Sequence, residues 1–502
     1  MKTAFHCFLF WLSVYTSSWG QPGFSKKYDF NRPSASFTGL IYEDGILNTF
    51  GVTFHDSVIN KQGIFFAKID TNGTILNTNT FFDALGDDYA TRLGSSIIKL
   101  NSGLGFVVPG VLLQRANGFL LFIDNDGNKV NFREYADTST ILDIYEKIFE
   151  VNNGFVVCGT KIRNDYSPCV FIAKMDFDGI KLWEKTYASQ SRDWYYNSVY
   201  LETPNSYILG ISSVPPLGTP VSSLNSQTVM LAIDSIGSEM WRWESIISLD
   251  EGGAGALQKT VDDNWIYLSA RADLNVSQNS WTLQPKVIVR DINFDLIWEK
   301  TFGLSNSNEN QLTCLNVTHD NNWVASGFMK NPQTPNTLSG SINKFTNTGD
   351  SIWSRYDTVI YYATAYTSHS ISGTVVLPSG SIITCGSVDD YSNLGKSYAW
   401  LLKINKNGCI DTLNCIISHT YIYDGNSNIS VFPNPTTSKA YFNSSDNLNL
   451  EAITILNSSG IVIKTIFPNE INEIDLSELS TGMYTLQFRW GNKILIKKII
   501  KL

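Results

Sequence analysis

The segment CVFIAKMDFDGIKLWEKTY, residues 169–187, contains the pattern that decides the fold. An apolar run ends at Asp176, a glycine follows three residues later at Gly179, and a second run carries Trp183. Asp and Gly suit tight turns, because the carboxylate accepts hydrogen bonds from backbone amides and glycine adopts positive φ freely. The segment therefore predicts a β-hairpin.

The pattern recurs along most of the chain. Its anchors are Asp70 with Gly73, Asp124 with Gly127, Asp176 with Gly179, Asp234 with Gly237, Asp291 with Phe294, Thr346 with Gly349, and Asn405 with Gly408. Subtracting successive anchors gives 54, 52, 58, 57, 55 and 59 residues, and Trp183, Trp241, Trp298 and Trp353 each stand seven residues after their anchor. We interpret the anchors as structural turn residues rather than calcium ligands, because further oxygen ligands at regular spacing are missing. The tryptophans are interpreted as packing residues between repeats rather than as ligand platforms.

Each repeat also contains an upstream hairpin signal. Turn clusters such as Asn152-Asn153-Gly154 and Pro378-Ser379-Gly380 precede short β-branched runs. Four strands in each of seven repeats, with no amphipathic helical period between them, predict an all-β chain whose residues 21–422 form a seven-bladed β-propeller. The Lys26-Lys27-Tyr28 segment is similar to the predicted outer strands, so we expect it to complete the last blade and hide the edge strands.

The N-terminus has the organisation of a cleavable signal peptide. Lys2 precedes an apolar run, small residues follow at Ser18 and Gly20, and cleavage after Gly20 is expected, so residues 1–20 would be removed. That run is too short to span a bilayer, and no transmembrane segment is expected in the mature chain. A net charge of -9 without a basic run gives no electrostatic basis for binding nucleic acid.

Export permits disulfides, and two pairs of cysteines are close enough in sequence to form them. Cys158 and Cys169 lie on neighbouring strands of one predicted hairpin, and Cys409 and Cys415 flank a short loop. Cys314 and Cys385 are expected to be buried strand residues. The cysteines and five histidines show no zinc-type spacing, so no metal site and no cofactor are predicted.

The sequence contains no pattern of catalytic residues: it has no Gly-x-Ser-x-Gly elbow, no His-Glu-x-x-His helix and no phosphate loop. We predict no catalytic residue and favour a binding or structural propeller. Two enzyme classes remain alternatives: a secreted hydrolase acting on polysaccharide or peptide, and a quinone-dependent dehydrogenase with tryptophan-rich blades. Residues 212–227 and 331–338 lengthen two equivalent connections, and these long loops are either a binding face or merely tolerated insertions.

A different pattern begins after Asn426. Residues 427–502 alternate apolar and polar positions in short runs, which predicts a small C-terminal Ig-like β-sandwich. Its distinctive residues are Pro433, Asn434, Pro435, Gly482, Tyr484, Lys497 and Lys498.

These tail motifs closely resemble the C-terminal sorting domain of type IX (Por) secretion, type A, from Bacteroidetes. The resemblance implies that the secretion machinery recognises the tail and that a sortase-like peptidase commonly removes it, leaving a protein that is secreted or held at the outer-membrane cell surface. Residues 45–408 also look like propeller regions that often precede such tails. The overall expectation is an exported propeller that contacts a glycan, a peptide or a surface protein. The alternative to a bacterial exported protein is a eukaryotic secreted protein, since Asn72-Gly73-Thr74 and Asn316-Val317-Thr318 have the pattern of N-glycosylation sites.

Overall fold

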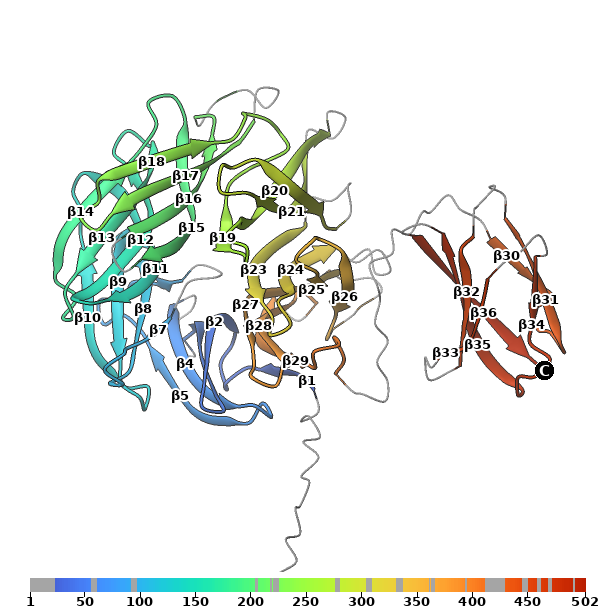
Figure 1. The fold of residues 1–502 in the computed structure, drawn as a ribbon. Helices are drawn as coiled ribbons and strands as arrows, with labels where there is room; N and C mark the ends of the chain where they lie inside the picture. Colours follow the sequence, from blue (N-terminus) through green and yellow to red (C-terminus); the bar gives the residue numbers. More distant parts are fainter. Residues whose placement is uncertain are drawn as a thin grey trace, which may run out of the picture.

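The computed structural model describes residues 23–55, 61–91, 97–203, 206–216, 219, 225–275, 280–303, 309–330, 337–360, 362, 366–392, 395–410, 429–444, 450–457, 462–467, 472–490 and 493–502. Throughout these ranges the regular secondary structure is β-strand, so the described chain is all-β (Figure 1). No helix in them has the length and apolar character that crossing a membrane requires. The predicted signal peptide, residues 1–20, lies outside the described residues.

Among the described strands, four sheets contain four antiparallel strands each, in chain order from one edge to the other. The first comprises β2 (Ala35–Glu43), β3 (Ile46–Phe54), β4 (Gln62–Asp70) and β5 (Ile75–Phe81). The second comprises β11 (Thr140–Val151), β12 (Gly154–Arg163), β13 (Pro168–Met175) and β14 (Lys181–Tyr187). The third comprises β15 (Asp193–Thr203), β16 (Ser206–Val214), β17 (Gln227–Asp234) and β18 (Glu239–Glu244). The fourth comprises β19 (Gly255–Lys259), β20 (Trp265–Asn275), β21 (Ser280–Arg290) and β22 (Leu296–Thr301).

One sheet departs from four strands because its first edge is divided. There β8 (Phe106–Leu112), β9 (Asn117–Ile123) and β10 (Lys129–Tyr135) follow the usual order. The edge next to β8 is shared by two short strands, β6 (Tyr89–Ala90) and β7 (Ile98–Lys99), which both pair with β8. The sheet therefore has five strands in the space of one repeat.

The largest sheet joins two repeats. It contains β23 (Gln311–Val317), β24 (Trp323–Lys330), β25 (Thr337–Phe345), β26 (Ser351–Asp357), β27 (Thr367–Val376), β28 (Ile382–Asp390), β29 (Lys396–Ile404) and β1 (Phe24–Tyr28). Its two halves are joined into one sheet by a short parallel pairing, in which Thr337 opposes Thr367 and Leu338 opposes Ser368. This pairing makes the sheet eight-stranded, where the repeats predict two separate sheets of four.

The N-terminal strand β1 pairs with β29 near the end of the repeat region. Lys26 opposes Leu401 and Lys27 opposes Trp400 in an antiparallel register. The indole of Trp400 also donates to the Ser25 hydroxyl at 2.9 Å. This is the outer-strand position that the sequence predicts for Lys26-Lys27-Tyr28.

The repeat anchors lie in tight turns. In each one the amide three residues after the anchor donates to the anchor's carbonyl, at 2.9–3.1 Å, and the residue providing that amide has φ between +68° and +88°. The carboxylates of Asp70, Asp124, Asp176 and Asp234 accept two further backbone amides each. In the repeat anchored at Asp291, Phe294 stands at the position that glycine occupies in the other repeats. Phe294 has φ of 68° and stacks on Trp243, with ring centroids 4.9 Å apart. Its aromatic contact compensates for a strained backbone.

Outer strands hold the turns of the next sheet in the chain. The hydroxyls of Tyr135 and Tyr187 donate to the carbonyls of Gly179 and Gly237, at 2.5 and 2.6 Å. Tyr28 of β1 donates in the same way to Gly73, at 2.9 Å. Lys300 and Arg355 replace tyrosine in later repeats and bind the carbonyls of Gly349 and Gly408. A repeated latch therefore connects neighbouring sheets.

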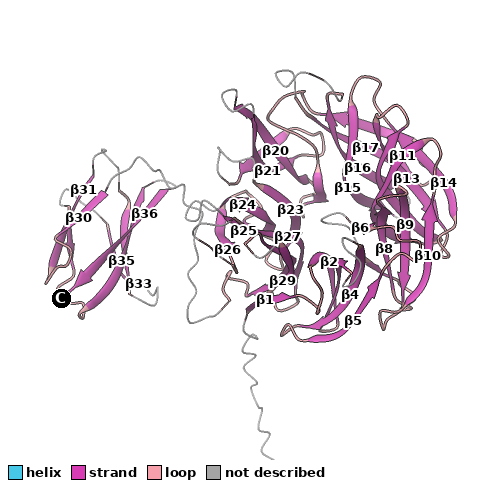
Figure 2. Ribbon diagram, turned by 180° about the vertical axis from the view of Figure 1, so that it is seen from behind, coloured by secondary structure: helices cyan, strands magenta, loops and turns pink. Residues whose placement is uncertain are grey.

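Buried apolar clusters fill the space between consecutive groups of strands. One cluster joins β12 and β13 to β15–β17, and another joins β24 and β25 to β27–β29. Phe37 and Phe65 pack with Cys385 and Leu401, so the first sheet also shares a core with the last. The clusters contain or contact Trp183, Trp241, Trp298 and Trp353, which confirms their predicted packing role. Figures 1 and 2 show the sheets around a common centre, with β2, β15, β23 and β27 facing it.

Two small sheets make up the described part of the tail. One contains β30 (Ile429–Phe432), β31 (Lys439–Ser444) and β34 (Glu473–Asp475). The other contains β32 (Ala452–Leu456), β33 (Val462–Ile466), β35 (Gly482–Trp490) and β36 (Lys493–Lys501). Residues of both sheets share one buried apolar cluster, which includes Phe442, Ile455 and Phe488.

The predicted bridge between Cys158 and Cys169 is wrong, since both are free, buried thiols. The hairpin register is the reason: Cys158 opposes Ile172 and Cys169 opposes Lys161, so the two cysteines lie three positions out of register. Cys409 is disulfide-bonded. Its predicted partner, Cys415, lies outside the described residues.

Candidate functional site

The innermost strands share an irregularity that the repeat pattern did not reveal. In β2, β11, β15, β19, β23 and β27, the pairing with the next strand shifts at a β-bulge near mid-strand. Bulges bend a strand and redirect its side chains, and each of these strands contributes residues at or beside its bulge to one cavity. The residues skipped at these bulges are Thr38, Glu146, Asn197, Ala256 with Leu257, Thr313 and Ser372, and further shifts near the strand ends skip Ile141 in β11 and Glu202 in β15.

Hydrogen bonds at the bulges connect one innermost strand to the next. The Thr313 hydroxyl donates to the carbonyl of Ile371 at 2.6 Å, and the Ser372 hydroxyl donates to that of Phe37 at 2.7 Å. The Ser198 hydroxyl likewise donates to the carbonyl of Ala254. The side-chain amide of Gln258 donates to the carbonyl of Leu315. The hydroxyls of Thr38 and Thr91 form a hydrogen bond at 2.9 Å. The bulges are therefore held in place by neighbouring sheets.

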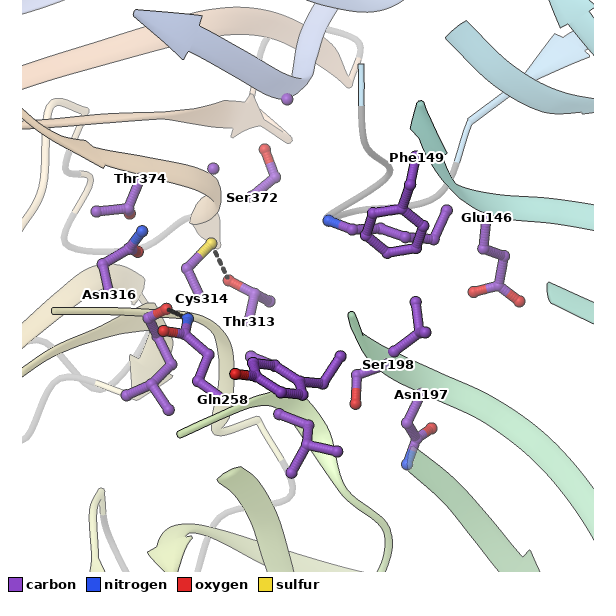
Figure 3. A pocket seen from close by; sticks show the side chains of 18 of the residues that line it. Glu146, Phe149, Asn197, Ser198, Gln258, Thr313, Cys314, Asn316, Ser372 and Thr374 are labelled. Atoms are coloured by element: carbon purple, nitrogen blue, oxygen red, sulfur yellow. Dashed lines mark hydrogen bonds between the residues drawn. The ribbon is translucent and has the colours of Figure 1, made fainter. Parts of the chain in front are cut away.

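A cavity of about 600 Å³ lies where these strands converge (Figure 3). Its volume is within the range of small-molecule sites. Its wall combines apolar groups such as Leu40 and Phe149 with many hydrogen-bonding groups. The polar lining residues are Glu146, Lys147, Asn197, Ser198, Gln258, Thr313, Asn316, Ser372 and Thr374, together with Tyr196, Tyr200 and Cys314.

Lys147 is the cationic residue of the described lining. It follows Glu146 at the bulge of β11, and within the described part of the chain its ammonium group has no hydrogen bond or ion pair. Burial lowers the pKa of Lys147, and the nearby thiols of Cys314 and Cys158 oppose that shift. The lining thus contains a partly desolvated amine that interacts electrostatically with two thiols.

The carboxylate of the described lining belongs to Glu146, which is 9% exposed. Its Oε1 accepts a hydrogen bond from the Thr160 hydroxyl at 3.2 Å. The Thr160 hydroxyl oxygen accepts the amide of Tyr196 at 3.1 Å, so Glu146 helps to hold β15 against β12. The Tyr196 hydroxyl is buried without a hydrogen-bond partner, and burial raises the pKa of that phenol well above its ordinary value.

The cavity thiol is not activated for nucleophilic chemistry. Burial raises the pKa of Cys314, although hydrogen bonds to hydroxyl groups and the charge of Lys147 oppose the shift. The thiolate is the reactive form of cysteine, so a raised pKa makes the thiol inert at neutral pH. Asn316, on the same strand, has a buried Oδ1 without a hydrogen-bond partner.

Other charged groups form ion clusters within the sheets. Arg115 contacts Asp83, Asp87 and Glu134, while Lys161 contacts Asp137, Asp143 and Glu184. These pairs satisfy buried charges and are not among the residues that line the cavity. Across the described residues, no group of three or more His, Cys, Asp or Glu side chains is placed to hold a metal ion.

The residues singled out from sequence mostly lie away from the cavity. The repeat-turn residues occupy the hairpins before the outer strands. Residues 212–227 and 331–338 connect β16 to β17 and β24 to β25, as predicted, but most of both segments lies outside the described residues. Arg192 holds the two ends of the connection between β16 and β17, because its guanidinium donates to the carbonyls of Ser213 and Asn225. The sequence contains a weak signal for the cavity residues: polar or small neighbours, such as Glu146-Lys147 and Asn197-Ser198, interrupt the apolar alternation.

The tail motifs are brought together although they are far apart in sequence. The Asn434 side chain, between Pro433 and Pro435, donates to the carbonyl of Lys498 at 2.8 Å and accepts the amide of Ile500 at 2.9 Å. Gly482 begins β35 opposite Lys501, and Lys497 and Lys498 lie on β36 opposite Leu486 and Thr485. Tyr484 is buried in the tail core and donates its hydroxyl to the carbonyl of Ser480 at 2.8 Å.

Comparison with known proteins identifies this segment. Residues 430–502 match the family model of the secretion system C-terminal sorting domain. The sorting-domain match implies that the chain is exported from the cell and handled by the type IX secretion machinery. No curated protein sequence matches the chain.

Solved β-propeller structures resemble part of the chain at low similarity. The β-propeller domain of the Trilobed protease from Pyrococcus furiosus, described as having an open velcro topology, aligns with 74% of this chain and 94% of its own, at 7% identity and a TM-score of 0.40. An α-L-arabinanase from Penicillium chrysogenum, complexed with arabinobiose, aligns with 64% of this chain and 98% of its own, at 9% identity and a TM-score of 0.37. Drosophila Plexin A in complex with Semaphorin 1b aligns with 76% of this chain and 86% of its own, at 8% identity and a TM-score of 0.39. Scores this low transfer no activity to the present chain.

Proposed function

We propose that the chain is an exported binding protein, in which residues 21–422 form a seven-bladed β-propeller and residues 427–502 form an Ig-like sandwich that directs secretion. Seven repeats, an N-terminal strand in the last sheet and apolar clusters between consecutive sheets support this architecture. The sorting-domain match supports the role of the tail. Residues 1–20 are removed as a signal peptide, and the mature protein is released or held at the cell surface.

The observation that carries the binding role is the convergence of bulged strands on one polar cavity. Among the described residues, hydroxyls, amides, one amine and one carboxylate line it, together with apolar surface, which is the composition of a small-molecule recognition site. Glycoside hydrolysis usually needs two carboxyl groups that flank the scissile bond. Glu146 is the one carboxylate in the described lining, so we favour binding over hydrolysis of a polysaccharide.

The binding role is tested by screening the full mature chain against glycans and peptides, with a parallel assay for hydrolysis. Asn197→Trp fills the cavity from β15, because the Asn197 side chain is exposed and lines it. Asn293→Trp, in an exposed turn, is the matched control. We expect saturable binding without turnover, lost in Asn197→Trp and kept in Asn293→Trp. Turnover of the ligand, or binding that survives Asn197→Trp, would overturn the proposal.

Export is tested separately in a bacterium that has type IX secretion. A chain truncated before residue 427 should accumulate inside the cell, whereas the full chain should reach the medium or the surface. Equal export of both chains would show that the tail has no sorting role.

A further inference from the structure

We propose that the central cavity binds a small polyhydroxylated carboxylate, with Lys147 pairing with the carboxylate group. A uronic acid at the end of an acidic glycan is a ligand of this class. The inference rests on the proposed binding function and specifies the ligand of the same cavity.

The first step of the argument concerns charge. Lys147 lines the cavity, and among the described residues no carboxylate forms an ion pair with its ammonium group. The thiols of Cys158 and Cys314 stay protonated, because burial raises the pKa of both. Glu146 is hydrogen-bonded to Thr160 and holds neighbouring strands together. A partly desolvated cation facing a polar cavity is stabilised by an anionic ligand.

The second step concerns the direction of hydrogen bonds. A hydroxyl has one proton to donate and two lone pairs that accept. Ser198, Thr313 and Ser372 each donate that proton to a backbone carbonyl of the neighbouring strand. Toward the cavity these three side chains therefore act as acceptors.

A third observation points to the same ligand chemistry. Asn316 lines the cavity, and its Oδ1 is buried without a hydrogen-bond partner, so rotation of this side chain brings an unsatisfied acceptor to the wall. Unsatisfied polar atoms are costly in a protein interior, and a ligand that donates to them is favoured. In the described lining, the acceptors at Ser198, Thr313 and Ser372 together with the amine of Lys147 suit a molecule that has several hydroxyl donors and a single carboxylate. Neutral sugars lack the anion, and inorganic phosphate has fewer hydroxyl donors than a sugar acid.

The test compares sodium D-glucuronate, D-glucose and inorganic phosphate by titration calorimetry on the full mature chain. Glucuronate should bind about tenfold more tightly than glucose, which corresponds to one charge-assisted hydrogen bond. Phosphate should bind more weakly than glucuronate. In Lys147→Met the preference for glucuronate over glucose should disappear, and in Lys147→Arg it should persist. Lys174→Met is the matched control: burial also lowers the pKa of Lys174, but Lys174 is on β13 and is not a lining residue.

Several outcomes would overturn the inference. Equal binding of glucose and glucuronate, equal binding of phosphate and glucuronate, or a preference retained in Lys147→Met would each do so. Asn197→Trp separates this inference from the proposed function. If some other ligand binds the wild type and is lost in Asn197→Trp, while glucuronate shows no preference, the cavity is a binding site and only the ligand class is wrong.

Discussion

The hydroxyl of Ser372 donates to the carbonyl of Phe37 at 2.7 Å, joining two residues that are 335 positions apart in the chain. Both residues lie at bulges, Ser372 in β27 and Phe37 in β2. The bond therefore fastens the last group of strands to the first. Both side chains are buried, so water cannot replace the bond without a local opening.

Removing this bond should weaken the whole repeat region. Ser372→Ala should lower the free energy of unfolding by about 1 kcal/mol, the usual net contribution of a buried hydrogen bond. Urea denaturation of the full chain measures the change. Ser238→Ala, in an exposed turn, should leave the unfolding midpoint unchanged. If both variants unfold at the wild-type midpoint, Ser372 does not stabilise the junction.

The tyrosine latches should contribute separately to stability. Tyr135→Phe and Tyr187→Phe each delete one hydroxyl that holds the carbonyl of a turn glycine. We expect each to cost about 1 kcal/mol, and the double variant to cost about the sum, because the two latches are distant and share no partner. Tyr166→Phe, at a residue that is 68% exposed, is the matched control. Thermal unfolding of the four proteins would contradict this if Tyr166→Phe were as damaging as either latch variant.

His369 should make stability depend on pH. Its Nε2 accepts the amides of Val359 and Ile360 at 2.9 and 3.1 Å, so Nδ1 carries the proton and donates to the carbonyl of Leu338. Burial lowers the pKa of His369 from 6.5 to about 4, and the bond to Leu338 opposes this shift. The unfolded chain therefore takes up the proton first as pH falls. The neutral imidazole's contribution is complete above pH 6.5 and is lost between there and about pH 4, at about 1.4 kcal/mol per pH unit.

Two measurements check this dependence. The NMR signals of the His369 ring should remain those of the neutral form until the pH approaches 4. In His369→Gln the corresponding slope of unfolding free energy against pH should disappear, although the variant is less stable at pH 7 because it cannot reproduce every bond. A ring that titrates near 6.5 would refute the buried neutral state.

Asn434 should stabilise the tail through its two bonds to β36. Asn434→Ala removes both bonds, so limited proteolysis should cleave the tail faster while the repeat region stays resistant. Thr437→Ala, at an exposed neighbour, is the control. Asn434→Asp keeps an acceptor for the Ile500 amide but loses the donor to Lys498, and an intermediate rate is expected. Equal cleavage rates for all variants would mean that Asn434 has no structural role in the tail.

The repeat architecture was readable from sequence because its signals are local. The spacing from Asp176 to Gly179 and Trp183 depends on one hairpin, and period-2 alternation reports burial of one face. The tail motifs were readable for the same reason, since Pro433 to Pro435 form a compact signature. The strand at Lys26-Lys27-Tyr28 was recognisable because it copies the other outer strands.

The cavity was not predictable because it depends on register and on strands from distant repeats. A bulge such as that at Glu146 shifts pairing by one residue, and alternation averaged over a strand hides it. The incorrect Cys158–Cys169 bridge has the same origin, because adjacent strands do not specify which residues face each other. The packing of Phe294 on Trp243 also needed the three-dimensional arrangement, since sequence marks Phe294 only as a missing glycine.

The pairing of β1 with β29 also affects how the molecule is made. Ser25 and Trp400 are 375 positions apart, yet their strands lie side by side. During synthesis the first strand must wait, unpaired, until nearly the whole repeat region has followed it. A chain that ends before β29 therefore lacks the partner strand of β1 and leaves the backbone groups of β1 unpaired.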